Sequence, residues 1–232
     1  MSMPATNDQI TSRLAAVPMF SDLSEGNLET LAGMVRFMRL PKGALIVSKD
    51  DPGSCMYLLL SGRVKVGITS PDGKELVLNY LEAPAHFGEM SLVEAESRTA
   101  DVVATTDVEL IALEGRDLAE AIRIEPNLAL SLIATLSRRL RATITRLEDM
   151  AFHDATHRVL RVVLNVATAN LEARGAAVVQ GMTHYDIATL AGTSRETASR
   201  VISQLARDGV VTTHGRRIIV DVSALSDRLT AE

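Results

Sequence analysis

Apolar and polar residues alternate over short distances in the first half of the chain, which predicts β-strands there. Strand-like runs are separated by turns that contain glycine, proline or aspartate. Short runs at this spacing indicate a sandwich or a barrel. Asp72-Gly73 lies between two runs and predicts a hairpin. The predicted strands are Val35–Leu40, Ala44–Ser48, Cys55–Ser61, Arg63–Thr69, Glu75–Leu81, Thr99–Thr105 and Val108–Leu113.

Helical periodicity flanks this region. We expect a short helix over 8–16 and another that Ser24 caps. The pattern becomes helical again near Asp117, and Pro126 suits the first turn of a long helix that runs to about Met150. Along this helix, a seam of mostly apolar residues recurs at gaps of three and four positions, as in a coiled coil. We interpret the seam as a homodimer interface, with an ordinary core-packed helix as the alternative. Its members are Ile133, Leu136, Leu140, Thr143, Leu147 and Met150.

The last third of the chain predicts a helix-turn-helix. Asp154 can cap a helix from Ala155 to Ala173, which Gly175 ends. Thr183 and Asp186 then have the spacing of a capping box, and a two-turn helix follows. Gly192 provides the turn and Ser194 caps the second helix, which completes the motif.

The second helix of the motif has two chemically distinct faces. Its apolar face carries Ala198, Val201, Ile202 and Leu205. Its polar face begins with Arg195, Glu196 and Arg200, and such N-terminal residues enter the major groove of DNA. Arginine can bind guanine and glutamate can accept from cytosine. The following hairpin carries Arg216 and Arg217 at its tip, near the DNA backbone. Further candidate DNA contacts are Thr183, Ser194, Thr197 and Ser199.

A second motif, in the strand-rich half, predicts a site for a phosphorylated sugar. Gly88 permits close backbone approach, and amides that open a short helix at 89–92, around Met90 and Ser91, can cradle an anion. Arg98 can bind phosphate with its planar fork, and the Thr99 hydroxyl can add a bond. Glu89 suits a sugar hydroxyl rather than a phosphate.

Charge divides the chain into two parts. The net charge is −5, which by itself argues against nucleic acid. Residues 1–134 hold 11 basic and 19 acidic side chains, whereas residues 135–232 hold 13 and 10. The second part is therefore compatible with DNA. A lone cysteine, Cys55, and the lack of a long apolar run or signal peptide favour a cytoplasmic protein without a membrane span.

Together these motifs resemble the cyclic-AMP receptor protein and fumarate–nitrate regulator superfamily. The resemblance rests on Tyr57–Val66, Phe87–Ser91, Arg98–Ala100, Ser137–Leu140 and Gly192–Thr197, within a match over roughly 15–222. It implies an α+β fold: a cyclic-nucleotide-binding β-roll (jelly-roll-like), a long dimerisation helix and a winged helix-turn-helix. The corresponding parts are a sensor domain over 1–125, a dimerisation helix and hinge over 126–153, and a DNA-binding domain over 154–232.

The cyclic-AMP receptor branch is the most similar. The resemblance implies that Gly88 and Glu89 hold a ribose, that Arg98 and Thr99 hold a cyclic phosphate, and that Arg139 supports Glu89. In that branch a Thr-Ser pair on the dimer helix contacts the base; here the pair reads Thr143-Ile144. The resemblance also implies a palindromic operator with TGTGA-like half-sites and contact with RNA polymerase.

Cyclic AMP is thus the effector that the sequence favours. A cyclic di-GMP effector, or no effector, is the alternative within the same fold, because Ile144 lacks the hydroxyl of serine. An enzyme or a kinase regulatory subunit is the alternative outside it, and the helix-turn-helix argues against both. No catalytic residues are expected. No metal site is expected either, because His153 and His157 are spaced like a ligand pair but no third ligand is evident.

Overall fold

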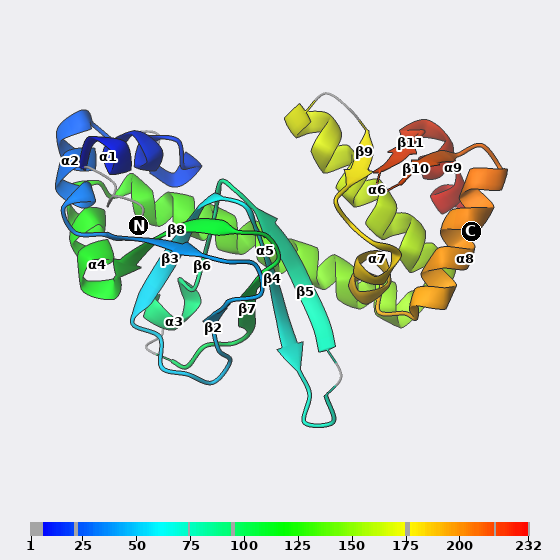
Figure 1. Cartoon of the computed structure of the whole chain (residues 1–232), viewed down its shortest axis with the longest axis horizontal. Coiled ribbons are helices and arrows are strands. Elements are labelled where there is room, and N and C mark those ends of the chain that lie inside the picture. Colours follow the sequence, from blue (N-terminus) through cyan, green and yellow to red (C-terminus); the bar gives the residue numbers. More distant parts are fainter. Residues whose placement is uncertain are drawn as a thin grey trace. The chain divides into compact units, whose positions relative to one another are not determined.

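The computed structural model describes residues 7–20, 23–73, 75–93, 96–174, 177–215 and 217–231. The chain divides into two compact units, Met1–Arg139 and Leu140–Glu232, which are described separately below. Their elements are labelled in Figure 1. Across the described ranges, no helix combines the length and apolar character that a membrane crossing needs.

The first unit is built around two antiparallel four-stranded sheets (Figure 1). One has the order β1-β8-β3-β6 and the other β2-β7-β4-β5. Leu59 and Leu110 from the first sheet pack against Val64 and Val102 from the second, all buried. The sandwich that the alternation predicted is therefore present. The strands are β1 Arg36–Leu40, β2 Leu45–Val47, β3 Cys55–Ser61, β4 Arg63–Thr69, β5 Glu75–Glu82, β6 Ala85–Phe87, β7 Asp101–Ala104 and β8 Val108–Glu114.

The predicted hairpin joins β4 to β5. Thr69 pairs with Glu75, and Gly73 has φ +81°, the left-handed conformation that glycine adopts without steric cost. Strand β7 begins at Asp101, two residues later than predicted, because Thr99 and Ala100 form a bend. Strand β6 was missed, since three residues next to a proline give no readable alternation.

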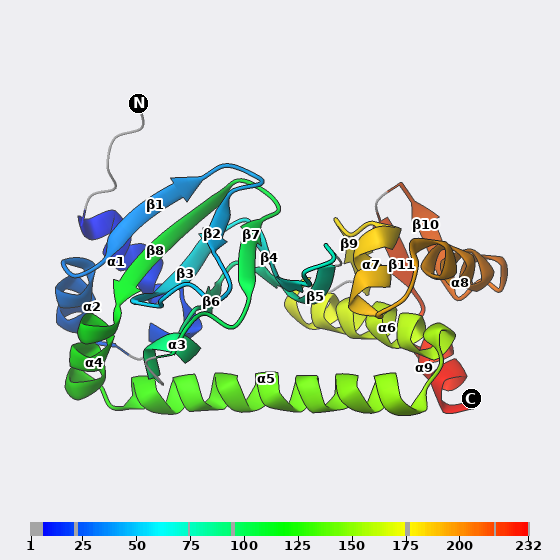
Figure 2. The ribbon, with the colours of Figure 1, turned by 90° about the horizontal axis from the view of Figure 1, so that it is seen from below.

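The shorter helices of the first unit are α1 Asn7–Ala15, the 3-10 turn Pro18–Phe20, α2 Glu25–Ala32, α3 Met90–Val93 and α4 Gly115–Ile124. Helices α1, α2 and α4 lie together at one end of the first sheet, whereas the short helix α3 lies apart from them, beside α5 (Asn127–Phe152) (Figure 2). Ser24 caps α2 as predicted, by accepting from the Asn27 amide. Leu14, Leu31 and Leu113 join the two layers in a second buried core.

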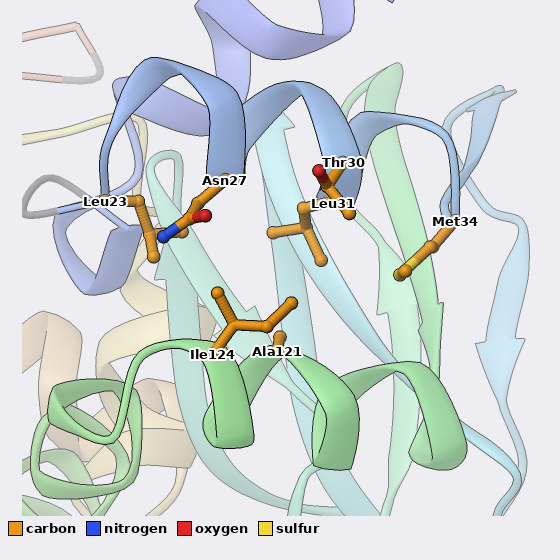
Figure 3. Close-up of a pocket in the computed structure, with 7 residues that line it drawn as sticks. All are labelled: Leu23, Asn27, Thr30, Leu31, Met34, Ala121 and Ile124. Atoms are coloured by element: carbon orange, nitrogen blue, oxygen red, sulfur yellow. The ribbon is translucent and has the colours of Figure 1, made fainter.

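Helices α2 and α4 leave a small groove between them (Figure 3). No charged side chain lines it, so it offers nothing that would bind a phosphate. Its lining consists of Leu23, Asn27, Thr30, Leu31, Met34, Ala121 and Ile124.

Helix α5, Asn127–Phe152, is a single long helix, as predicted (Figure 2). It begins directly after Pro126 rather than including it. In the first unit its Leu128 and Leu132 are buried in the core. The boundary between the two units falls inside this helix, after Arg139.

The second unit places a three-stranded sheet and the helix-turn-helix on α6, Ala155–Arg174 (Figure 1). The Asp154 carboxylate accepts from the His157 amide and so caps α6 as predicted. Gly175, the predicted stop, lies outside the described residues. The other elements are β9 Val178–Gln180, α7 His184–Leu190, α8 Arg195–Arg207, β10 Val211–His214, β11 Arg217–Val220 and α9 Val222–Ala231.

Two of these elements were not predicted. Strand β9 pairs with β11 and extends the expected hairpin to the order β10-β11-β9. It is only three residues long and depends on a partner almost 40 residues away. Helix α9 packs on α6 through Leu225, which is fully buried.

Candidate functional site

The predicted phosphate-binding arginine is buried in the first unit. Arg98 is 7% exposed, and its guanidinium donates to Gly88 O at 2.7 Å, Ser91 Oγ at 2.8 Å and Cys55 O at 2.6 Å. All three acceptors are uncharged. Within the described ranges, no carboxylate forms an ion pair with Arg98. A buried cation that no anion offsets is costly unless a ligand supplies the charge.

Two glycines let the backbone approach this guanidinium. Gly88 has φ +84°, and a Cβ built there would lie 2.6 Å from Arg98 Nη1. A Cβ on Gly53 would lie 2.2 Å from Ser91 Oγ. Sequence reasoning missed Gly53 and the Cys55 carbonyl. The Pro52-Gly53 pair was interpreted only as a turn, and a backbone carbonyl carries no sequence signal.

Glu89 is the second notable group of this site. It is 1% exposed, and its Oε1 accepts from Arg139 on α5. Arg139 also donates to His86 O at 2.5 Å. The other carboxylate oxygen, Oε2, is buried and has no hydrogen-bond partner among the described residues. A buried carboxylate oxygen with an unfilled acceptor position is suited to a hydroxyl donor.

Burial keeps the neighbouring ionisable groups neutral. Burial, with Arg139 and Arg138 nearby, lowers the pKa of His86 to about 4. Burial also raises the pKa of Tyr57 to about 12, and the Arg98 guanidinium lies 5.9 Å from the centre of the Tyr57 ring. Among the described residues, two arginines and one glutamate thus lie around Gly88, namely Arg98, Arg139 and Glu89, and this excess of basic side chains favours an anion.

The structure brings Gly88, Glu89, Ser91, Arg98 and Arg139 together, but not every candidate joins them. Met90 begins α3 with its side chain 43% exposed, and the Thr99 side chain is exposed. The amides of Leu92 and Val93 donate to Glu89 O within the chain, and the anion cradle expected from the amides that open this helix stays a prediction. Thr143 and Ile144 belong to the second unit, where both are exposed.

In the second unit, the local signals of the helix-turn-helix are confirmed. Thr183 and Asp186 form a reciprocal capping box at the start of α7. Gly192 has φ +61° in the turn, and Ser194 Oγ accepts from the Thr197 amide to cap α8. These contacts place α8 after a defined turn and expose its first residues.

The two faces of α8 are separated as the sequence predicted. Ala198, Val201, Ile202 and Leu205 are buried. Arg195, Glu196 and Arg200 are exposed. The Glu196 carboxylate accepts from its own backbone amide, which holds the pKa of that carboxyl below its usual value. Glu196 therefore stays an acceptor near neutral pH.

Several hydroxyls predicted to contact DNA are engaged within the protein. Thr183 Oγ1 donates to Asp186, and Ser194 Oγ donates to Thr197 Oγ1 at 3.2 Å. Ser199 is half-buried, with its Oγ 2.9 Å from His184 Nδ1. Arg217 is exposed at the start of β11. Arg216, the other candidate in the wing, lies outside the described residues.

Two arginines that sequence reasoning missed bind the turn between α7 and α8. Arg146 on α5 donates to Leu190 O at 3.0 Å, and Arg158 on α6 donates to Ala191 O at 2.8 Å and Gly192 O at 3.2 Å. These carbonyls end α7, where a cation is favourable. Burial lowers the pKa of Arg146. The ends of α5 and α6 are thus tied to the turn that precedes α8.

The predicted seam of α5 is largely exposed within the single chain. The exposed fractions are 58% for Ile133, 62% for Leu140, 62% for Leu147 and 52% for Met150. Thr143 is also exposed, and Leu136 is half-buried. Large apolar side chains in a row at this exposure are typical of a surface that a partner covers.

Comparison with known proteins assigns both units. Residues 37–125 match the family model of the cyclic nucleotide-binding domain, and residues 157–228 match that of the Crp-like helix-turn-helix domain. The chain is 36% identical over 194 residues to the cyclic AMP receptor protein of Thermus thermophilus, covering 84% of this chain and 88% of that protein.

Two further proteins are similar over most of the chain. A CRP-like cAMP-activated global transcriptional regulator of Mycobacterium tuberculosis is 29% identical over 212 residues, covering 90% of this chain and 95% of the relative. The structure of CLP, a c-di-GMP responsive global regulator of Xanthomonas campestris, matches with a TM-score of 0.70 and 25% identity, covering 85% of this chain and 99% of that one. These relatives are regulators and not enzymes. The chain therefore belongs to the cyclic-AMP receptor protein and fumarate–nitrate regulator superfamily, as a cyclic-nucleotide-responsive, DNA-binding transcription regulator.

Proposed function

We propose that this regulator is a homodimer whose effector is cyclic AMP, bound by the residues around Arg98 and Glu89. One observation carries the proposal: among the described residues, a buried guanidinium without a carboxylate partner and a buried carboxylate oxygen without a donor flank the same glycine, Gly88. A cyclic nucleotide would satisfy both. Its phosphate offsets Arg98, and a ribose hydroxyl donates to Glu89 Oε2.

The effector would act through α5. Arg139 on this helix donates to the Glu89 carboxylate, so a ribose bound to Glu89 would contact a carboxylate that the helix holds in place. In the proposed dimer, Thr143 and Ile144 would face the base. An effector that binds one arrangement of the helix pair more tightly shifts the population towards it. Arg146 and Arg158 would carry the change to the turn before α8.

The DNA target follows from α8 and from the two-fold symmetry of a dimer. Arg195, Glu196 and Arg200 are exposed and would read base edges in a TGTGA-like half-site. Arg216 and Arg217 of the wing would contact phosphates. Two copies of α8 require a palindromic operator with half-sites about one helical turn apart. Such a regulator would work in the cytoplasm and contact RNA polymerase.

A cyclic di-GMP effector is the second candidate, and Ile144 favours it. The cyclic-AMP receptor branch that the sequence resembles has serine there, and the similar regulator of Xanthomonas campestris responds to c-di-GMP. Without the serine hydroxyl, a base loses one hydrogen-bonding group, which costs about 1–3 kcal/mol when its partner is buried.

Calorimetry tests the proposal directly. The purified full chain is titrated with cyclic AMP, cyclic GMP and cyclic di-GMP, and its mass is measured by light scattering. We expect a dimer that binds cyclic AMP and then shifts a palindromic TGTGA-type duplex. Ile144→Ser should strengthen cyclic AMP binding and leave cyclic di-GMP binding no tighter. If the protein binds cyclic di-GMP and not cyclic AMP, cyclic di-GMP takes the place of cyclic AMP as the proposed effector. A monomeric mass both with and without the effector would refute the dimer.

A further inference from the structure

Three metal-ligating side chains meet where α5 ends and α6 begins, outside the nucleotide site and the DNA-reading face. They are Asp149 on α5, His153 in the break between the helices, and His157 in the first turn of α6. One ligand atom from each lies within 4.8 Å of the others. The sequence showed the histidine pair without a third ligand, and the fold supplies Asp149.

The packing holds these groups close together. The two imidazole rings are stacked, with centroids 3.8 Å apart and planes 10° apart. His153 Nδ1 lies 3.6 Å from Asp149 Oδ1, and it is buried with no hydrogen-bond partner among the described residues. Asp149 and His157 are 8% and 4% exposed, whereas 36% of the His153 side chain is accessible. The cluster is thus preorganised on one side and open to solvent at His153.

We propose that Asp149, His153 and His157 bind a divalent transition-metal ion of the zinc type. Two imidazoles and one carboxylate are ligands that Zn²⁺ accepts, with water in the fourth position. Tetrahedral zinc at bond lengths of about 2.0–2.1 Å brings ligand atoms to about 3.3 Å from one another. The ligand atoms lie within 4.8 Å here, so side-chain rotations that move them by about 1.5 Å and turn the stacked rings until their nitrogen lone pairs converge would close the site. Arg161 Nε lies 3.3 Å from Asp149 Oδ1, the same oxygen that His153 Nδ1 approaches.

The position of the site gives the ion a structural effect. Asp149 lies on α5, His153 lies in the break between the helices and His157 lies on α6. One ion bound to all three would therefore hold the end of α5 to the start of α6. Arg158 donates both to His153 O at 2.8 Å and to Ala191 O at 2.8 Å. The same arginine therefore joins the metal-binding segment to the turn before α8. A bound ion would reduce the freedom of this connection, independently of the cyclic nucleotide.

Cobalt(II) titration of the tag-free full-length protein tests the site, because tetrahedral Co²⁺ has visible absorption bands and occupies zinc sites. We expect one Co²⁺ per chain, displaced by Zn²⁺. His153→Gln and Asp149→Asn should each weaken binding by more than about 100-fold, the upper range for losing only an outer-shell partner. His214→Gln is the matched control, since it removes an exposed histidine of the same unit outside the cluster.

A second readout separates metal binding from a folding defect. Circular dichroism and cyclic nucleotide affinity should be the same in His153→Gln and the wild type. Zn²⁺ should slow hydrogen exchange of amides around 150–158 in the wild type and in His214→Gln, but not in His153→Gln. No 1:1 binding, equal affinity in the two ligand variants and the wild type, or binding that leaves exchange unchanged would each overturn the proposal.

Discussion

Replacing Arg98 by lysine keeps the positive charge at the proposed phosphate site but removes the planar fork. The guanidinium uses Nη1 for Gly88 O and Ser91 Oγ, and Nη2 for Cys55 O. A single ammonium cannot span these acceptors, which come from separate segments of the chain. Arg98→Lys should therefore leave at least one buried carbonyl without its donor and present a point charge to the ligand.

The magnitude follows from the contacts that are lost. A hydrogen bond from a charged donor contributes about 1.5–3 kcal/mol net. Losing one charged hydrogen bond to the phosphate should thus cost about 2–3 kcal/mol of binding free energy, which weakens affinity about 30- to 150-fold. Arg98→Ala removes the charge as well and should cost about 4–5 kcal/mol, which weakens affinity about 700- to 4,000-fold.

Calorimetry with the cyclic nucleotide that binds the wild-type protein measures both losses. Denaturant unfolding of each variant without ligand separates the effect on binding from the effect on stability. Because three hydrogen bonds disappear in Arg98→Ala, we expect its free energy of unfolding to fall by about 2–4 kcal/mol. An Arg98→Lys protein that is folded and binds within threefold of the wild type would refute the assignment of Arg98 to the phosphate.

Four further substitutions test other parts of the structure. Gly88→Ala should lower the free energy of unfolding by about 1–2 kcal/mol, because φ is +84° and the new Cβ meets Arg98 Nη1. Calorimetry should also show weaker effector binding. An unchanged free energy of unfolding together with unchanged effector affinity would contradict this geometry. Arg195→Ala should cost about 1–3 kcal/mol on the specific operator and relax the base preference, whereas Arg217→Ala should weaken all duplexes alike; fluorescence anisotropy on half-site variants distinguishes them. The pKa of His86 is lowered to about 4, so this group stabilises the fold fully above pH 6.5 and loses that contribution as the pH falls towards 4. Over this window stability should fall by roughly 3 kcal/mol, and His86→Gln should flatten the slope in urea unfolding curves measured at each pH.

Most secondary structure in this chain could be predicted, because its signals are local. Ser24, Asp154, Thr183 and Ser194 cap helices by contacts with residues three positions away, and each was identified from its own neighbourhood. Longer strands such as β3 showed their alternation directly. Strands β6 and β9 did not, since a three-residue strand exists only through its pairing partner.

The candidate site was likewise predictable only in part. The kinds of residue that bind phosphate and ribose stood within 12 positions of one another, so the chemistry of the site was evident. The geometry was not. Arg98 contacts the Cys55 carbonyl across 43 positions, and Arg146 reaches Leu190 across 44. Backbone carbonyls are identical at every residue, so no sequence pattern marks which of them a side chain will reach.

The sequence by itself determined most of the longer elements, the two motifs, the periodic seam of α5 and the separation of faces on α8. Each of these depends on periodicity or on contacts within one turn. Only the tertiary structure decided that, in the part of the chain it describes, Arg98 is buried without a carboxylate and Glu89 keeps one oxygen without a donor, and that Asp149 joins His153 and His157. These features depend on which distant segments pack together and on which polar atoms lose contact with water, and both are properties of the folded chain.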